Sequence, residues 1–295
     1  MTQRLNILKT FKLYINGNFS RSESGRYYLP KNKAGQSLAN CCLASRKDFR
    51  NAVQSARKAQ DAWANRSAYN IGQILYRIAE NLESRKVELS NIISKESSLS
   101  KKKTDQEVET AVDIMVYFAG WADKFQQVFS QVNPVASSHF NFSIFEPSGI
   151  VAVLNDNNTS FVDLITAIAS TLCGGNASVI LAAENKPLSA ITFAEVLHHS
   201  DLPAGVVNLL TGNKNELAPH FASHKDVNSL LMIGNDFEVK KIKETACENL
   251  KRVIQWSKDS KESSVKPSPA LIKSFMEVKT TWHPIEQIGP GATAY

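Results

Sequence analysis

The sequence has few of the features that mark membrane, secreted or metal-binding proteins. No apolar run approaches the roughly 18 residues that a membrane span needs, and the first four residues lack the apolar core of a secretory signal. The four cysteines, Cys41, Cys42, Cys173 and Cys247, show no metal-ligand spacing, and the adjacent pair is poorly placed for a mutual disulfide. These absences predict a cytoplasmic chain with reduced cysteines, no metal site and no membrane partner.

The sequence also lacks a strongly basic segment. Its formal net charge of +6 comes largely from scattered lysines, and the one short run, Lys101 to Lys103, stands just before an expected helix start. Nucleic-acid binding needs a basic face interleaved with aromatic residues, which this sequence does not show. We therefore expect a solvated surface and no nucleic-acid partner. At 295 residues with 43% hydrophobic content, the chain can form one large or two ordinary domains.

The N-terminal region predicts a hairpin followed by helices. Phe11, Leu13 and Ile15 precede the dipeptide Asn16-Gly17 and then Phe19, which indicates two strands joined by a tight turn. Apolar residues then recur at helical spacing. They are Phe49, Val53, Ala56 and Trp63, then Ile71, Ile74, Leu75, Ile78 and Leu82, then Ile92 and Ile93.

The helix boundaries are predicted from capping residues. Ser45 and Ser67 are expected to cap the first two helices. Thr104 and Glu107 form the pattern of a capping box, so we expect a fourth, long helix to begin there and to end near Gln131.

Between residues 133 and 147 the apolar pattern changes to period two, which is typical of a strand. The apolar face of this strand would carry Phe140, Phe142 and Ile144, and the wettable face would carry Asn141 and Ser143.

From residue 149 onward, strands and helices alternate. Strands are expected at 150–155, 178–182, 206–210, 229–233 and 250–255, and helices at 161–172, 188–199, 214–223 and 237–247. Such repetition predicts an α/β fold with a doubly wound, parallel, Rossmann-like sheet, preceded by the helical N-terminal region.

The last part of the chain predicts a linker and one more strand. Residues 257–269 (SKDSKESSVKPSP) are polar and contain two prolines, which is typical of a linker. Beyond it, Met276, Val278, Thr280 and Trp282 alternate with polar residues. A lone strand must pair with another, and the sequence does not show whether this one can reach the strand at 133–147.

The segment from Gly149 to Gly212 resembles the aldehyde dehydrogenase family. It reads GIVAVLNDNNTSFVDLITAIASTLCGGNASVILAAENKPLSAITFAEVLHHSDLPAGVVNLLTG, and the family's corresponding stretch contains TPWNFP, ALAAGN, LKPAE and LPPGVVNVVTG. The resemblance extends over residues 11–256. The tail SFMEVKTTWHPI, residues 274–285, is similar to the family's final strand, which follows the catalytic domain in full-length members. The whole chain is similar to the degenerate half of tandem, two-copy aldehyde dehydrogenases.

The resemblance implies a division of the chain in which the catalytic domain is missing. Its parts are an N-terminal hairpin and helices of the nucleotide-binding domain at 1–132, oligomerisation strands at 133–148, a Rossmann-like sheet at 149–256, a linker replacing the catalytic domain at 257–270, and a C-terminal oligomerisation strand and tail at 271–295. The strands at 133–148 and 271–295 would form a β oligomerisation arm.

The resemblance also implies a loss of chemistry. Family members use a cysteine nucleophile, transfer hydride to NAD, and activate water with a glutamate. None of the four cysteines has the family motif around it, and Cys173 is interpreted as an apolar filler at a helix end. The glutamate position is Trp256, which cannot accept a proton. Asn158 is the only match to a family catalytic position, that of an oxyanion donor. A turn formed by residues 155–158 is the alternative that we favour.

The family's dinucleotide contacts are partly retained. Glu184, Gly212 and Gly234 match, but the lysine of LKPAE is Ala182, and the phosphate loop GSTEVG becomes residues 234–239 with two acidic side chains. A further glycine becomes Lys214, whose bulk could obstruct adenine or whose charge could meet a phosphate. We expect NAD not to be required and to bind weakly at best.

The segments retained intact are the assembly strands. The leading hypothesis is a pseudoenzyme that docks on a full-length aldehyde dehydrogenase, or on itself, through Phe140, Phe142, Ile144, Val278 and Trp282. The alternatives are a residual NAD-binding module, an oxidoreductase acting on aldehydes with NAD that is completed in trans by a partner chain, and a decaying product without specific function.

Overall fold

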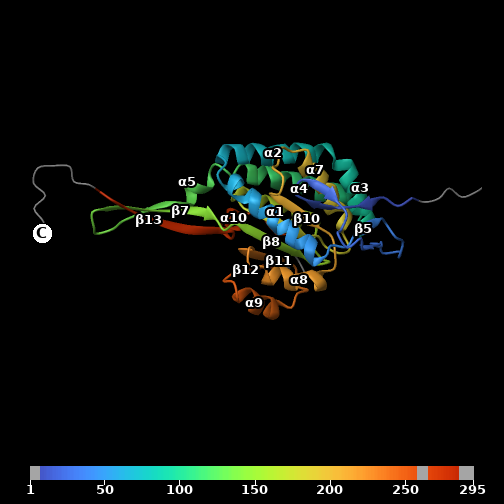
Figure 1. Cartoon of the computed structure of the whole chain (residues 1–295). Helices are drawn as coiled ribbons and strands as arrows, with labels where there is room; N and C mark the ends of the chain where they lie inside the picture. The colour runs from blue at the N-terminus through green and yellow to red at the C-terminus, as the bar shows by residue number, and fades with distance from the viewer. Residues whose placement is uncertain (1–6, 258–264, 286–295) are drawn as a thin grey trace, which may run out of the picture.

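The computed structural model describes residues 7–257 and 265–285, which form an α/β body and a β-arm that projects from it (Figure 1). A seven-stranded sheet runs through the body in the order β12-β11-β8-β9-β10-β2-β3. No helix within these two ranges is long and apolar enough to cross a membrane.

Five parallel strands form the centre of this sheet, and four helices connect them. The strands are β8 (Ile150–Asn155), β9 (Ala177–Leu181), β10 (Val207–Leu210), β11 (Ser229–Ile233) and β12 (Arg252–Trp256), and the helices are α6 (Phe161–Cys173), α7 (Pro187–His198), α8 (Lys214–Ser223) and α9 (Val239–Cys247). The predicted doubly wound sheet is confirmed, with boundaries within two residues. The chain runs from β8 outward to β10 and then returns to β11 on the other side of β8, so the β8–β11 border is the topological switch point.

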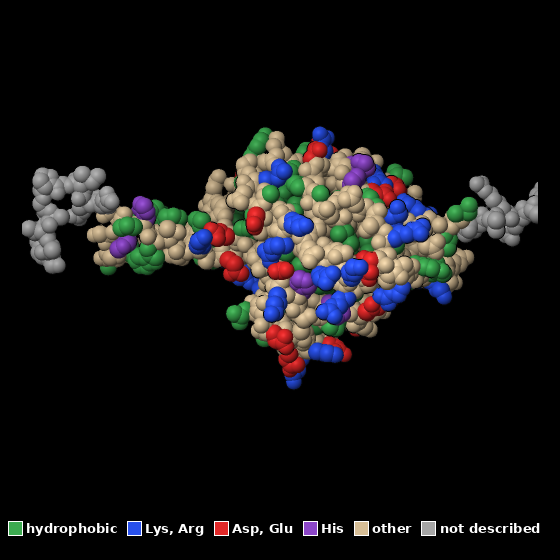
Figure 2. Space-filling model, viewed as in Figure 1, with side chains coloured by type: hydrophobic (Ala, Val, Ile, Leu, Met, Phe, Trp, Pro, Cys, Tyr) green, Lys and Arg blue, Asp and Glu red, His purple; other side chains and the backbone are tan. Residues whose placement is uncertain are grey.

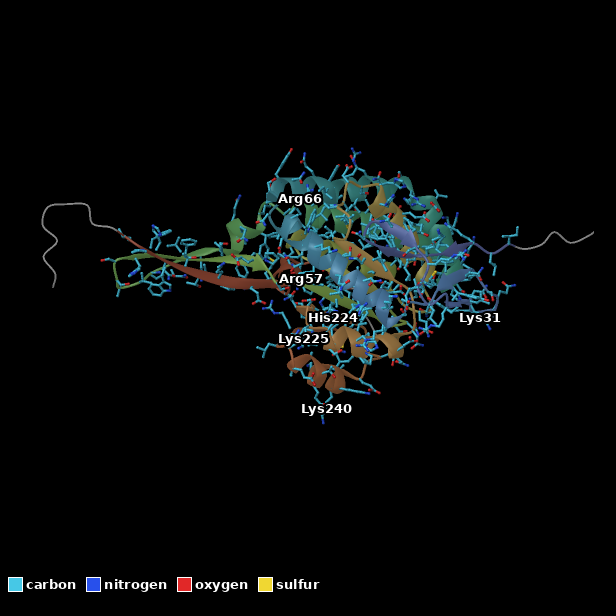
Figure 3. All side chains as sticks on the ribbon, in the orientation of Figure 1. Lys31, Arg57, Arg66, His224, Lys225 and Lys240 are labelled. Atoms are coloured by element: carbon cyan, nitrogen blue, oxygen red, sulfur yellow. The ribbon has the colours of Figure 1, made fainter. Side chains whose placement is uncertain are left out.

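The two faces of the sheet carry separate cores. Val151 and Val153 of β8 pack toward α6 and α7, whereas Ala152 and Leu154 pack toward α1 (Arg46–Ala64) and α8. Both faces of the parallel strands are therefore buried, which explains their nearly continuous apolar sequences. At the amino edge, Arg57 of α1 donates to the carbonyl oxygen of Asp226 at 2.7 Å, in the loop that also holds His224 and Lys225 (Figure 3).

The predicted hairpin is confirmed as β2 (Leu13–Ile15) and β3 (Asn18–Ser20), which extends the sheet beside β10. Asn16 and Gly17 have φ values of 51° and 70°, the left-handed conformation that a two-residue turn of this kind requires. Phe11 lies outside the hairpin, contrary to expectation. It belongs to β1 (Thr10–Phe11), which joins β5 (Asn40–Cys42) and β4 (Tyr27–Tyr28) in a small separate sheet.

The helical region covers one face of the sheet with α2 (Ala68–Ser84), α3 (Lys86–Ser97) and α4 (Lys101–Ala119), while α1 covers the other. Ser45 and Ser67 cap α1 and α2 as predicted. The Ser45 side chain accepts from the amide nitrogens of Lys47 and Asp48, and the Asp48 carboxylate accepts from the backbone amide of Ser45.

The predicted boundaries of the fourth helix are wrong at both ends. It begins at Lys101, so Lys101 to Lys103 form its first turn and Thr104 is buried inside it, bonded to the Ser90 hydroxyl at 2.8 Å. Glu107 accepts from the amide of Phe161 at 2.8 Å, so it serves the start of α6 instead of a capping box. The helix ends at Ala119, and a turn leads to the short α5 (Phe125–Phe129), whose Phe125 ring packs 5.5 Å from that of Phe145.

The arm is a three-stranded antiparallel sheet in the order β13-β7-β6. Its strands are β6 (Gln131–Asn133), β7 (His139–Pro147) and β13 (Met276–Pro284). β13 pairs with β7 over its full length, from Met276 opposite Pro147 to Pro284 opposite His139. The last strand therefore reaches the strand at 133–147, a point that the sequence left open.

The connection to β13 falls only partly within the described residues. Residues 258–264 of the expected linker lie outside them. The following segment contains α10 (Pro269–Lys273), where Ile272 is fully buried and packs into the core with Phe275. The polar composition predicted no helix here because a single buried isoleucine gives no periodic signal.

Candidate functional site

The loops at the carboxyl edge of the parallel sheet carry all four residues that the sequence nominated for chemistry or cofactor binding. Asn158 follows β8, Glu184 follows β9, Gly212 follows β10 and Gly234 follows β11. Parallel strands end at one edge, so these residues share the region where doubly wound sheets bind ligands.

A buried carboxylate, that of Asp156, lies at the switch point itself. Asp156 is 1% exposed. Its Oδ2 accepts from the amides of Asn235 at 3.1 Å and Asp236 at 3.4 Å, and its Oδ1 accepts from the amide of Asn158 at 2.8 Å and the hydroxyl of Thr159 at 3.2 Å. Sequence reasoning placed Asp156 in a turn and missed these longer-range contacts. The available signal was an acidic residue directly after the first buried strand.

Gly234 is where this carboxylate meets the loop after β11. Its φ of +112° is one that residues with side chains rarely adopt. A Cβ atom built at this position would lie 2.0 Å from Oδ2 of Asp156. Any side chain at position 234 would overlap the Asp156 carboxylate, so this position requires glycine.

The segment 155–158 forms a turn that ties neighbouring loops together. The bond from the Asn158 amide to Oδ1 of Asp156 closes an Asx-turn. Asn155 donates through Nδ2 to the carbonyl of Leu181 at 2.8 Å, and Asn157 accepts from the amide of Asn185 at 3.3 Å. The structure thus contains the turn that the sequence favoured for this segment, and Asn158 lies exposed on it.

Glu184 and Lys214 are both committed to neighbouring protein groups. Glu184 is half-buried and accepts from Nδ2 of Asn213 at 3.4 and 3.5 Å. Lys214 forms an ion pair of 2.6 Å with Asp236 and lies 4.9 Å from the centre of the Phe237 ring. The ammonium group of Lys214 is thus paired with Asp236 in this structure. Lys214 lines one end of a cavity of about 520 Å³ between α8 and α9.

The two residues weighed against the family's catalytic functions, Cys173 and Trp256, are both buried. Cys173 is buried at the end of α6, where its thiol donates to the carbonyl of Phe118 at 3.3 Å and burial raises its pKa to about 12. Trp256 is buried, with its ring 6.4 Å from that of Phe275. Residues 7–257 and 265–285 also contain no cluster of three or more side chains placed to hold a metal ion.

The arm carries the second set of nominated residues, and its two faces differ from the sequence expectation. On β7 the polar residues Asn141 and Ser143 are buried, whereas Phe140 is 45% exposed. The polar side chains are covered because they bond across the arm: Asn133 donates to both through Nδ2, at 2.6 and 2.9 Å. The alternation was predicted correctly, but the residues of β7 that were expected to be wettable, Asn141 and Ser143, are the buried ones.

The pairing register separates the apolar residues of the arm onto opposite faces. Phe140 and Phe142 lie opposite His283 and Thr281, so Val278 and Trp282 project from the other face. Val278 and Trp282 are each 58% exposed. Figure 2 shows hydrophobic and histidine side chains gathered on the visible face of the projecting arm.

Comparisons with known proteins agree with this fold. Residues 19–255 match the model of the aldehyde dehydrogenase family. Retinal dehydrogenase 2 of Gallus gallus is 32% identical over 255 residues, which cover 83% of this chain and 48% of that protein. D-glyceraldehyde dehydrogenase (NADP(+)) of Thermoplasma acidophilum is 30% identical over 249 residues, which cover 82% of this chain and 49% of that protein.

A solved structure shows the same similarity. The NAD+ complex of an aldehyde dehydrogenase from Bacillus cereus superposes with a TM-score of 0.80 and 25% identity, covering 84% of this chain and 51% of the other. The chain thus spans about half the length of the relatives that it matches. Because the family model covers most of the sequence, the chain belongs to the aldehyde dehydrogenase family.

Proposed function

We propose that this chain is a non-catalytic family member that serves as an assembly or regulatory subunit, docking on a full-length aldehyde dehydrogenase through its β-arm. The observation that carries the proposal is the arm, which projects from the body and exposes Phe140, Val278 and Trp282 (Figure 1). Covering a large apolar side chain contributes up to about 2 kcal/mol, and a long edge strand attracts a pairing partner.

The edge strand supports docking because β13 pairs on one side only. Its nine residues bond to β7, and no described strand pairs with its other side. Ion pairs such as Lys279 with Glu146, at 3.0 Å, fasten β13 to β7. The arm is thus internally assembled and still offers an unpaired strand edge and exposed apolar side chains on both faces.

The positions of the cysteines and of Trp256 support the non-catalytic part of the proposal. Among the cysteines only Cys247 is exposed, and it ends α9 just before β12 begins. It therefore lies at the amino edge of the sheet, opposite the loops that hold Asn158 and Glu184. Trp256 stands in the core where the resemblance places the family's general base.

We also propose that the subunit does not require NAD. The family's pyrophosphate contact corresponds to the loop after Gly234, and two amides of that loop already bond to Asp156. Ala182 replaces a ribose-binding lysine, and Glu184 bonds to Asn213. The residues present therefore do not fit the dinucleotide.

The test is affinity capture of the tagged chain from its native cells, with partners identified by mass spectrometry. We expect stoichiometric recovery of a full-length aldehyde dehydrogenase by the unaltered chain and its loss with the double variant Val278→Asp and Trp282→Asp. Tyr69→Ser is the matched control, since Tyr69 is 70% exposed on α2 of the body. Recovery of this chain alone, as a monomer or a homo-oligomer, would overturn the proposal.

A further inference from the structure

We propose that Asp156 is a built-in anion that occupies the ligand-binding crevice of the sheet, so that the chain has exchanged a bound phosphate for its own carboxylate. The inference goes beyond the subunit role, because it concerns the body of the molecule and holds whether or not a partner binds.

The position of the carboxylate is the first support. Doubly wound sheets bind anionic ligands at the switch point, where loop amides point outward from the strand ends. Here that point is the β8–β11 border. The amide of Asp156 donates to the carbonyl of Ile233 at 3.1 Å, which fixes the residue over the end of β11. Its side chain accepts from the amides of Asn235 and Asp236, which follow β11.

The number of donors is the second support. Two backbone amides bond to one carboxylate oxygen, and a third amide and the Thr159 hydroxyl bond to the other. Successive amides of this kind form the concave arrangement that binds phosphates and other anions. The carboxylate is buried and is held by neutral donors, as a bound anion would be.

The exclusion of any other anion is the third support. The carboxylate lies directly on Gly234, where even a Cβ atom would be 2.0 Å from Oδ2. A phosphate at these amides would overlap the carboxylate and would be repelled by its charge. The glycine that permits close approach of a ligand in such sheets here permits close approach of Asp156.

Two neighbouring lysines, Lys214 and Lys186, bond to the loops around Asp156. Lys214 bridges from α8 to Asp236 in the loop that Asp156 holds. Lys186 donates to the carbonyl of Thr159 at 2.7 Å, which fastens the loop after β9 to the loop after β8. These bonds tie the loops around Asp156 to one another, and a cavity of about 520 Å³ remains beside them between α8 and α9.

The experiment compares thermal unfolding of the full chain and of Asp156→Ala, with sodium formate, sodium pyrophosphate or NAD added at constant ionic strength. We expect no ligand-dependent shift for the unaltered chain. Asp156→Ala should unfold several degrees lower and recover part of the loss, saturably, with formate or pyrophosphate, since a ligand that binds only the folded state stabilises it. Asp61→Ala, which removes an exposed carboxylate of α1, should show neither effect.

Two results would overturn the proposal. One is stabilisation of the unaltered chain by millimolar pyrophosphate or NAD, which would show that the crevice is open. The other is an Asp156→Ala variant as stable as the unaltered chain. If that variant does not fold, Asp156→Asn decides: a lowered unfolding temperature supports the proposal, because an amide cannot accept from donors on both sides, and an unchanged temperature contradicts it.

Discussion

The carboxyl edge of the sheet and the β-arm differ in how far the chain satisfies its own side chains. At the edge, Asp156, Glu184 and Lys214 all bond to neighbouring loops. On the arm, Asn133 bonds to Asn141 and Ser143, but Nδ2 of Asn141 is buried without a hydrogen-bond partner, and Phe140 and Trp282 are exposed. The loop amides at the switch point are occupied by the chain's own Asp156 carboxylate, whereas apolar side chains of the projecting arm are exposed. This difference is why we propose that the chain acts through its arm.

The largest expected effect is at Gly234, because a side chain there would overlap the Asp156 carboxylate at the edge of the sheet. Gly234→Ala combines a strained φ with overlap of the Asp156 carboxylate, which should lower the free energy of unfolding by roughly 3–5 kcal/mol. Urea denaturation measures the loss. Gly25→Ala is the control: Gly25 also has a positive φ, of 68°, but a Cβ there meets nothing within 4 Å. Equal losses in the two variants would show that the carboxylate does not constrain position 234.

The next effect is a pH dependence of stability that arises in the body and not in the arm. Glu96 is buried in the body, accepts from the amides of Leu188 at 2.5 Å and Ser189 at 3.2 Å, and has its pKa raised by burial from 4.5 to about 7. A carboxyl whose folded pKa is raised contributes stability below its unfolded pKa, and that contribution is lost as pH rises through the folded pKa. Stability should therefore fall by up to about 3 kcal/mol between pH 4.5 and 7 through this group.

The measurement is urea denaturation across that pH range, compared with Glu96→Gln. The variant should lack this component of the pH dependence. Glu96 lies in α3 of the body, so substitutions in the arm should leave this component of the pH dependence unchanged. Identical pH profiles for the two proteins would contradict the assignment to Glu96.

A smaller effect identifies which face of the arm docks. Phe140→Ser and Trp282→Ser alter opposite faces, and each removes a side chain that is about half exposed or more. The substitution on the face that contacts the partner should weaken binding by about 1–3 kcal/mol, which corresponds to roughly 10- to 100-fold in affinity. Titration against the captured partner measures this, and neither variant should change the stability of the body. Full affinity in both variants would leave the arm without a role in docking.

The smallest effect tests the internal polar bonds of the arm. Thr280→Val removes the hydroxyl that bonds to Ser143 at 2.8 Å between β7 and β13. The expected loss is about 1 kcal/mol, seen as faster hydrogen exchange of β13 amides. Exchange at the amides of β8 should stay unchanged, which keeps the effect within the arm.

The sequence predicted the parallel sheet well because each buried strand is continuously apolar and each helix has a regular apolar spacing. It failed at the fourth helix because the Glu107 carboxylate bonds to Phe161, which lies 54 positions further along the chain. It missed the role of Asp156 for the same reason, since the donors at residues 235 and 236 are 79 and 80 positions away. Periodicity also could not show whether the polar or the apolar residues of β7 are the buried ones, because the residues alternate in the same way in either case.

The central claim is that the arm assembles this chain with a full-length family member, and the mass of the native complex tests it most directly. The chain is captured from its native cells and measured by light scattering. The account predicts a complex whose mass equals this chain, 32.6 kDa, plus a full-length aldehyde dehydrogenase in fixed proportion. A mass of 32.6 kDa, or whole multiples of it without a second protein, would contradict the account.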